Sequence, residues 1–244
     1  HAVQQIGNRP CLIIPWFDGR HIPPEEINRD ICLHVGQLLA TMHKMARSIN
    51  LDIPHVTQSV EYNLDWMNDQ HILNQSTILA NAAIVHRDEF VHLLRKGHPE
   101  PTEFVLSHRD MNPNNLLECN DTLMILDWEL AGWSSPLDEL VDVGLEWCRF
   151  CQYKTDIKLF TAIVEGYGSI EKLTSCQSLD GVWQRLYSAL LQAVYNHLYN
   201  EAEIFSLSET ERIVNAERYI LQYEELKKYE NIFSQAILSH IMTA

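Results

Sequence analysis

Long apolar stretches are missing from this 244-residue sequence. No segment offers the roughly 18 continuous apolar residues that cross a membrane, and the N-terminus lacks the pattern of a signal peptide. Cysteine is scarce and scattered: there are six, and the nearest pair, Cys148 and Cys151, has no second pair at zinc-binding spacing. These absences argue against a membrane partner and a zinc site, and they predict a cytoplasmic protein with reduced thiols.

Positive charge is also in short supply. There are 18 Lys and Arg against 33 Asp and Glu, which gives a formal net charge of −15. Nucleic-acid binding is therefore not expected, because phosphate backbones require a basic surface. The acids are unevenly spread: residues 61–150 hold 5 basic and 16 acidic side chains, a balance of 5 − 16 = −11, whereas residues 1–60 are neutral. Such a field suits Mg²⁺ and a cationic substrate, although acidic surfaces also serve solubility.

Within the acidic region lies the most informative stretch, the sequence SHRDMNPNNLL at residues 107–117. Asp110 completes a His-x-Asp pattern, Asn115 follows five residues later, and Asp127 comes directly after a four-residue apolar strand. Kinase-type phosphoryl transfer uses this order of side chains: one carboxylate orients the attacking hydroxyl, and an Asn and a second carboxylate hold Mg²⁺. Each residue alone could simply cap a loop or strand, but the ordered set favours catalysis by Asp110 and metal binding by Asn115 and Asp127.

The rest of the pattern predicts an α+β chain that is predominantly helical. Strands are expected at residues 10–15 and 103–106, and a hairpin at 116–117 and 123–126 would bring Asn115 and Asp127 to the same end of two paired strands. A loop is expected at residues 50–55. Apolar periodicity predicts helices from residue 23 to about 45, at 62–79, 82–94, from 136 onward, and at 155–167, 180–203, 208–229 and 231–242.

Four stretches carry a family resemblance: residues 108–115, residues 125–132, the LATMH sequence at 39–43 and residues 11–19. Together they resemble the aminoglycoside phosphotransferase and choline kinase superfamily, whose fold is similar to that of protein kinases. The resemblance implies that residues 1–20 are the end of an N-terminal lobe and its hinge. Residues 21–244 would then be a helical C-terminal lobe with a small central β-hairpin, a catalytic loop at 107–135 and a helical substrate-binding part at 136–244.

The resemblance also implies roles for single residues. Asp110 would be the catalytic base, Asn115 and Asp127 would bind Mg²⁺, and His108 would be a structural residue that packs near Trp128. The cofactors would be ATP and Mg²⁺. No Gly-rich loop or Val-Ala-x-Lys strand precedes residue 10, so most of the N-terminal lobe is absent from this chain. We therefore expect either a portion of a longer kinase or a degenerate relative, and poor ATP turnover by the chain alone.

The hinge permits one finer prediction. In kinase-like folds a backbone carbonyl and, two residues later, a backbone N–H bind the edge of adenine. When Gly19 is matched to the glycine of the family, these positions fall at Pro15 and Phe17. Proline keeps its carbonyl and lacks only the N–H, so Pro15 suits the accepting position. It could equally do no more than end a strand.

Arg109 raises the alternative of a protein kinase, because His-Arg-Asp is also the sequence of protein kinases, in which the Arg can bind a phosphorylated activation loop. Three features oppose it. Only eight residues, 128–135, separate Asp127 from the next helix, no Ala-Pro-Glu follows, and Glu129 stands where protein kinases have Gly. Glu129 is instead expected beside the metal-binding side chains, and Arg109 is expected to make a local ion pair or face solvent. The small-molecule branch is favoured.

For the acceptor, the sequence offers two groups of candidates. Asp138, Asp142 and Glu146 recur every four residues on one helix and could hold amines, face solvent or, with Glu139, hold the catalytic loop. Trp183 and Tyr187 could line a pocket for an ammonium group, although aromatics at helical spacing are more often core. We therefore expect an ATP-dependent phosphotransferase acting on a hydroxyl of a small, cationic molecule such as choline, a thiamine-like compound or an aminoglycoside. The alternative is a catalytically silent binding protein of the same fold. Oligomeric state is not predicted.

Overall fold

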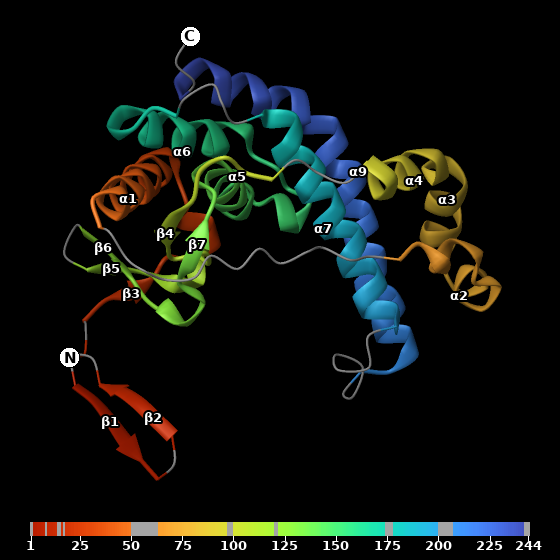
Figure 1. Cartoon of the computed structure of the whole chain (residues 1–244), viewed down its shortest axis with the longest axis horizontal. Helices are drawn as coiled ribbons and strands as arrows, with labels where there is room; N and C mark the ends of the chain where they lie inside the picture. Colours follow the sequence, from red (N-terminus) through yellow and green to blue (C-terminus); the bar gives the residue numbers. More distant parts are fainter. Residues whose placement is uncertain are drawn as a thin grey trace.

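The computed structural model describes residues 2–7, 9–13, 16, 18–49, 63–96, 100–119, 122–173, 178–199 and 207–241. Helices dominate these residues, with small antiparallel sheets set among them (Figure 1). The α-helices are α1 (Arg29–Arg47), α2 (Gln70–Gln75), α3 (Thr77–Val85), α4 (Arg87–Lys96), α5 (Pro136–Trp147), α6 (Ile157–Ile170), α7 (Leu179–Tyr199) and α9 (Glu209–His240). Short 3₁₀ helices are η1 (Pro24–Glu26), η2 (Asp65–Asn68), η3 (Pro113–Asn115), η4 (Trp128–Leu130) and η5 (Phe150–Gln152). The predicted, predominantly helical architecture is confirmed.

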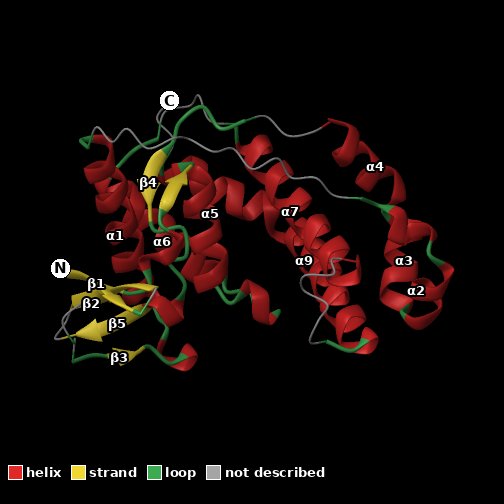
Figure 2. Cartoon of the chain, turned by 60° about the horizontal axis from the view of Figure 1, so that its bottom comes forward, coloured by secondary structure: helices red, strands yellow, loops and turns green. Residues whose placement is uncertain are grey.

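The core is organised around two close helix pairs. Helices α1 and α6 cross where Gly36 faces α6 and Gly166 faces α1: a Cβ at Gly36 would lie 2.0 Å from the carbonyl oxygen of Ile163, and one at Gly166 would lie 2.0 Å from that of Leu33. Backbone therefore packs directly on backbone at this crossing. Helices α7 and α9 run antiparallel and side by side (Figures 1 and 2), and α6 contacts α9, so both pairs share one buried core.

Three small antiparallel sheets are described. Strands β1 (Ala2–Ile6) and β2 (Arg9–Ile13) form a hairpin that stands apart from the helices in Figure 1. Strand β3 (Arg20–His21) pairs with β5 (Leu116–Cys119), which pairs with β6 (Thr122–Ile125). Strand β4 (Val105–Ser107) pairs with β7 (Gly132–Ser134). The β4–β7 sheet joins the two ends of the loop at residues 107–135, and the β5–β6 hairpin lies within that loop.

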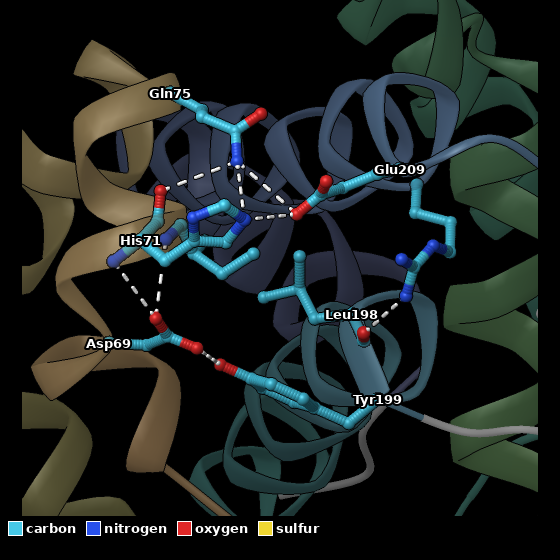
Figure 3. A network of polar contacts seen from close by, with 8 residues as sticks. Asp69, His71, Gln75, Leu198, Tyr199 and Glu209 are labelled. Carbon is cyan, nitrogen blue, oxygen red and sulfur yellow. Dashed lines mark hydrogen bonds and ion pairs between the residues drawn. The ribbon is translucent and has the colours of Figure 1, made fainter.

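Helices α2 to α4 lie on the far side of the α7–α9 pair from β5 and β6 (Figure 2). Figure 3 shows how α2 is attached. One carboxylate oxygen of Asp69 accepts the backbone N–H groups of His71 and Ile72 at 3.0 and 3.3 Å, which caps α2, and the other accepts the Tyr199 hydroxyl at 2.9 Å. His71 Nε2 lies 2.7 Å from Glu209 Oε1. Helix α2 is thus joined to the last residue of α7 and the first residue of α9.

Several predicted helix boundaries were wrong, and capping explains most of them. The two helices expected over 62–94 are four shorter elements, η2 and α2 to α4, because the side chains of Asp69 and Ser76 accept backbone N–H groups and start new helices. The helix expected from residue 23 begins at Arg29, since Asn28 caps it. Residues 209–240 form one helix instead of two, because neither Gly nor Pro interrupts them. The expected loop at 50–55 lies outside the described residues. No helix within the described residues is long and apolar enough to cross a membrane.

Candidate active site

Asp110 is half-buried at the end of the β4 segment, and both of its carboxylate oxygens are held by neighbouring amides. Asn112 Nδ2 donates to Oδ1 at 2.7 Å, and Asn115 Nδ2 donates to Oδ2 at 2.7 Å. The same Asn115 nitrogen also donates to the backbone carbonyl of Asp110 at 2.8 Å. The carboxylate is therefore held in one orientation, and the amide oxygen of Asn115 points away from Asp110.

The β5–β6 hairpin brings Asn115 and Asp127 together, as predicted. Leu116 is paired with Ile125, and beyond that pair the Leu126 N–H donates to the Asn115 carbonyl at 2.8 Å. Asp127 comes next, exposed to solvent and in the left-handed region at φ 56° and ψ 67°. Asp tolerates this conformation better than most residues, and such backbone positions cluster at functional sites.

His108 connects the two parts of this loop. Its Nε2–H donates to the Leu126 carbonyl at 2.7 Å, and its Nδ1 accepts the Asp110 backbone N–H at 3.3 Å. The ring also meets Trp128 edge-on, with 4.9 Å between centroids. Glu129, the next residue, is exposed. His108 thus links Asp110 to the strand end that carries Asp127.

A buried polar cluster beneath the loop anchors it to the helical core. The Oε1 atom of Glu139, a residue only 3 % exposed, accepts the Arg109 backbone N–H at 2.9 Å and the Ser107 hydroxyl at 2.8 Å. Its Oε2 lies 3.2 Å from Nε2 of the fully buried His43, whose Nδ1 lies 3.0 Å from the Tyr167 hydroxyl. Burial by itself raises the pKa of the Glu139 carboxyl, but the bonds and charge of His43 and the bonds from Arg109 and Ser107 outweigh it, so that the pKa is lowered.

An open cleft of about 600 Å³ adjoins Asp110, between the loop, β7, α5 and α7. This volume is typical of sites for small molecules. Phe104 and Trp133 line it together with Val182 and Leu186. Its charged lining consists of six acids and two bases: Glu100, Asp110, Asp138, Glu139, Asp142, Glu146, Arg109 and Arg185. The three acids predicted from their spacing on α5 are therefore brought together with Asp110.

The three predicted acids of α5 differ in their surroundings. Arg185 donates to both carboxylate oxygens of Asp138, from Nε at 3.1 Å to each and from Nη2 to Oδ1 at 2.6 Å. Asp142 is open to the cleft but surrounded by protein on its other sides, and this burial together with the charges of Asp138, Glu139 and Glu146 raises its pKa to about 7. The pKa of Glu146 is raised by burial and by the charge of Asp110, against a lowering hydrogen bond from Cys151.

The remaining predicted site residues lie elsewhere. Trp183 and Tyr187 are 2 % and 5 % exposed, do not line the cleft, and face α9, where Trp183 Nε1 donates to Ser234 Oγ at 2.9 Å and the Tyr187 hydroxyl donates to Glu230. Their predicted place in an acceptor pocket is wrong, because the aromatic face of α7 is the one that packs on α9. Pro15 and Phe17 lie outside the described residues.

Sequence reasoning missed Arg185, and it gave Glu139 only as one of several acids. The available signal for the first was that Arg185 is the one Lys or Arg within α7. For Glu139, nothing in the local pattern separates the one acid of α5 that turns into the core from the three that face the cleft.

The architecture is that of a kinase-like phosphotransferase: a helical fold, a loop at residues 107–135 that contains the β5–β6 hairpin, and a cleft beside Asp110. The model of the phosphotransferase enzyme family matches residues 1–173, and the chain belongs to that family. The expected superfamily is thereby confirmed.

Two solved structures support the fold assignment. A choline/ethanolamine kinase family protein from Mesorhizobium loti superposes with a TM-score of 0.53 at 15 % identity, covering 90 % of this chain and 70 % of that one. A choline kinase from Cryptosporidium parvum superposes with a TM-score of 0.51 at 13 % identity, covering 91 % of this chain and 72 % of that one. At such identities the likeness concerns the fold alone. Among curated proteins, none matches this chain in sequence.

Proposed function

We propose that this protein is an ATP- and Mg²⁺-dependent phosphotransferase that acts on a hydroxyl group of a small, cationic molecule. The observation that carries the proposal is the position of Asp110. Its carboxylate is held by Asn115 on the side of the hairpin that ends at Asp127, and it also lines the acidic cleft. A phosphoryl donor on the first side and a hydroxyl acceptor in the cleft would both reach it.

Asp110 would orient the acceptor hydroxyl and accept its proton. In the transfer, the hydroxyl oxygen forms a bond to the γ-phosphorus of ATP while the bond from that phosphorus to the β–γ bridging oxygen breaks, and the electron pair of that bond leaves with ADP. The carboxylate does not have to reorient before the reaction, because Asn112 and Asn115 already hydrogen-bond both of its oxygens. General bases contribute typically about 10²–10⁴-fold to the rate of such a step.

The residues next to Asp110 fit a magnesium ion. The amide nitrogen of Asn115 is used by Asp110, so its oxygen is left to bind a cation, and Asp127 supplies a carboxylate from the adjoining strand end. Within the described residues no group of three or more His, Cys, Asp or Glu is placed to hold a metal. Mg²⁺ suits two protein oxygens, because it takes its remaining ligands from phosphates and water and would neutralise charge on the transferred group. Glu129 would lie near this pair, and His108 and Trp128 would support it.

The acceptor would place its cationic group beside Asp142 and Glu146. These carboxylates line the cleft on successive turns of α5, about 6 Å apart along the helix axis, so an ammonium group between them could contact either one. Asp138 is already bound to Arg185 and is a weaker candidate. Adenine would be bound in the hinge by Pro15 and Phe17, with residues 1–20 belonging to an N-terminal lobe and residues 21–244 forming the C-terminal lobe. Choline, thiamine-like compounds and aminoglycosides have the required combination of hydroxyl and positive charge.

The test is a phosphorylation screen with [γ-³²P]ATP and Mg²⁺ against amino alcohols, thiamine-like compounds and aminoglycosides, performed on the protein encoded by the complete reading frame. Wild type should label at least one of them. Asp110→Asn and Asp127→Asn should each lower the transfer rate by at least about 10²-fold. Asp88→Asn, at an exposed position of α4, should leave the transfer rate unchanged. A transfer rate insensitive to Asp110 and Asp127 would overturn the mechanism. Nucleotide binding without transfer to any acceptor would favour the silent binding protein.

A further inference from the structure

Arg109 is held more firmly than an exposed arginine usually is. Its backbone is in the left-handed region, with φ 68°, and its N–H donates to the buried Glu139 carboxylate at 2.9 Å. Its side chain lies across β7 at Gly132, where an added Cβ would come within 2.9 Å of Nη1 and 3.4 Å of Cδ. An alanine at 132 would force the end of the Arg109 side chain to shift. The arginine is thus directed along the wall of the cleft beside Asp110.

The charged residues around Arg109 do not explain why a positively charged side chain is held at this position. Arg185, the other base of the cleft, is bound to Asp138 through a two-pronged ion pair. Among the residues that the structure describes, no carboxylate pairs with the Arg109 guanidinium, and of the two expected alternatives, a local ion pair or a solvent-facing side chain, the exposed side chain is the one observed. A cationic acceptor would be repelled by a second cation in its own cleft. The guanidinium therefore matches an anion that enters the cleft only during the reaction.

We propose that Arg109 binds the phosphoryl group as it reaches the acceptor and on the phosphorylated product. This inference rests on the proposed function, because it needs a phosphoryl group beside Asp110. Transfer brings a dianionic group among carboxylates that would otherwise repel it. A planar guanidinium can donate two parallel hydrogen bonds to phosphate oxygens and offset that repulsion. Arg109 would thus be a catalytic residue that contacts the reacting group and allows an acidic cleft to accept an anion.

Inorganic phosphate is the probe for a first test that needs no turnover. The full chain is titrated with phosphate at pH 7.5 and low salt, and binding is followed by ³¹P line broadening. Wild type should bind saturably, and Arg109→Ala should weaken binding by about 10–100-fold, as expected for loss of hydrogen bonds between charged groups. Arg109→Lys should retain part of the affinity. Arg29→Ala, which removes one positive charge on α1 outside the cleft, should bind as wild type does.

Gly132→Ala is a second variant, because it leaves the net charge unchanged and its Cβ, 2.9 Å from Nη1, would shift the guanidinium. It should weaken phosphate binding measurably but less than Arg109→Ala does, with an unchanged far-UV circular dichroism spectrum. No saturable binding by wild type, or equal binding by wild type and Arg109→Ala, would overturn the inference. An affinity that follows net charge alone, with Gly132→Ala like wild type and Arg29→Ala weakened, would also overturn it.

Kinetics separate this inference from the proposed function. With an acceptor identified by the screen, Arg109→Ala should lower kcat by at least about tenfold, leave or lower the acceptor KM, and raise the product inhibition constant. A protein that fails to transfer phosphate in an Asp110-dependent manner, yet binds phosphate through Arg109, refutes the proposed function and leaves an anion site. A protein that transfers phosphate equally well without Arg109 refutes the inference and leaves the proposed function intact.

Discussion

Replacement of Glu139 tests whether the buried cluster beneath the loop at residues 107–135 holds that loop in place. Glu139→Ala would remove the acceptor of the Arg109 N–H, the Ser107 hydroxyl and the His43 ring, although Ser107 Oγ and His43 Nε2 would still lie 3.1 Å from each other. Each lost partner is worth about 1–3 kcal/mol, and breaking a buried pair as a whole costs about 3–5 kcal/mol. We expect a loss near 3–5 kcal/mol in the free energy of unfolding. Glu139→Gln keeps the shape and one acceptor oxygen, and should lose only about 1–2 kcal/mol.

Urea unfolding followed by tryptophan fluorescence would measure these losses, with an unchanged m-value as the sign that the two variants unfold as wild type does. The pH dependence gives a second readout. Because folding lowers the pKa of Glu139 below its ordinary value of 4.5, the stabilisation is present above that value and is lost as the pH falls through the lower, folded-state pKa. Glu139→Gln should remove that part of the acid sensitivity.

The exposed Glu25→Ala serves as the control for Glu139, and it should stay within about 0.5 kcal/mol of wild type. If Glu139→Ala unfolded within about 1 kcal/mol of wild type, the cluster would not hold the loop as we infer. The same would follow if Glu139→Gln kept the full acid sensitivity of wild type.

Three further predictions concern the core and the cleft. Gly36→Ala should lower the melting temperature, because the added Cβ would lie 2.0 Å from the Ile163 carbonyl oxygen. Overpacking typically costs about 1–3 kcal/mol, which exceeds the gain in helix propensity from glycine to alanine. An unchanged melting temperature would contradict the close helix crossing. Because the pKa of Asp142 is raised to about 7, the carboxyl is mostly neutral at pH 6 and mostly charged at pH 8, so the affinity for a cationic acceptor should rise over this range and become flat in Asp142→Asn, as isothermal calorimetry would show. A double-mutant cycle of Asp138→Asn and Arg185→Ala should give a coupling energy of about 1 kcal/mol, the upper end for partly exposed pairs, and a value near zero would contradict the ion pair.

Local sequence was sufficient to predict the loop and hairpin. Asp110, Asn112 and Asn115 lie within six residues of one another, so their contacts depend on turn geometry that side-chain type and spacing largely determine. The convergence of Asn115 with Asp127 also follows from one short hairpin. Residues 120 and 121, which join the two strands, lie outside the described part of the chain.

Features that depend on contacts between distant segments were not predictable in this way. The aromatic stripe of α7 suits either a binding pocket or a core, and only the presence of α9 places Trp183 against Ser234, which lies 51 residues later in the sequence. The break of the expected helix at Ser76 also involves a distant segment, because the Ser76 hydroxyl that caps α3 donates to Glu217 of α9 at 2.6 Å.

Helix α5 shows why its acids cannot be understood as a single polar face. Asp138 and Glu139 are neighbours, and a helix turns by about 100° per residue, so the first points into the cleft toward Arg185 and the second into the core toward His43. Trp147, at the other end of the helix, donates from Nε1 to the Met111 carbonyl at 2.8 Å. The loop at residues 107–135 is therefore bound at both ends of the helix that also presents Asp142 and Glu146 to the cleft. A displacement of α5 would move the proposed base and the proposed ammonium site together, which keeps their separation matched to one acceptor.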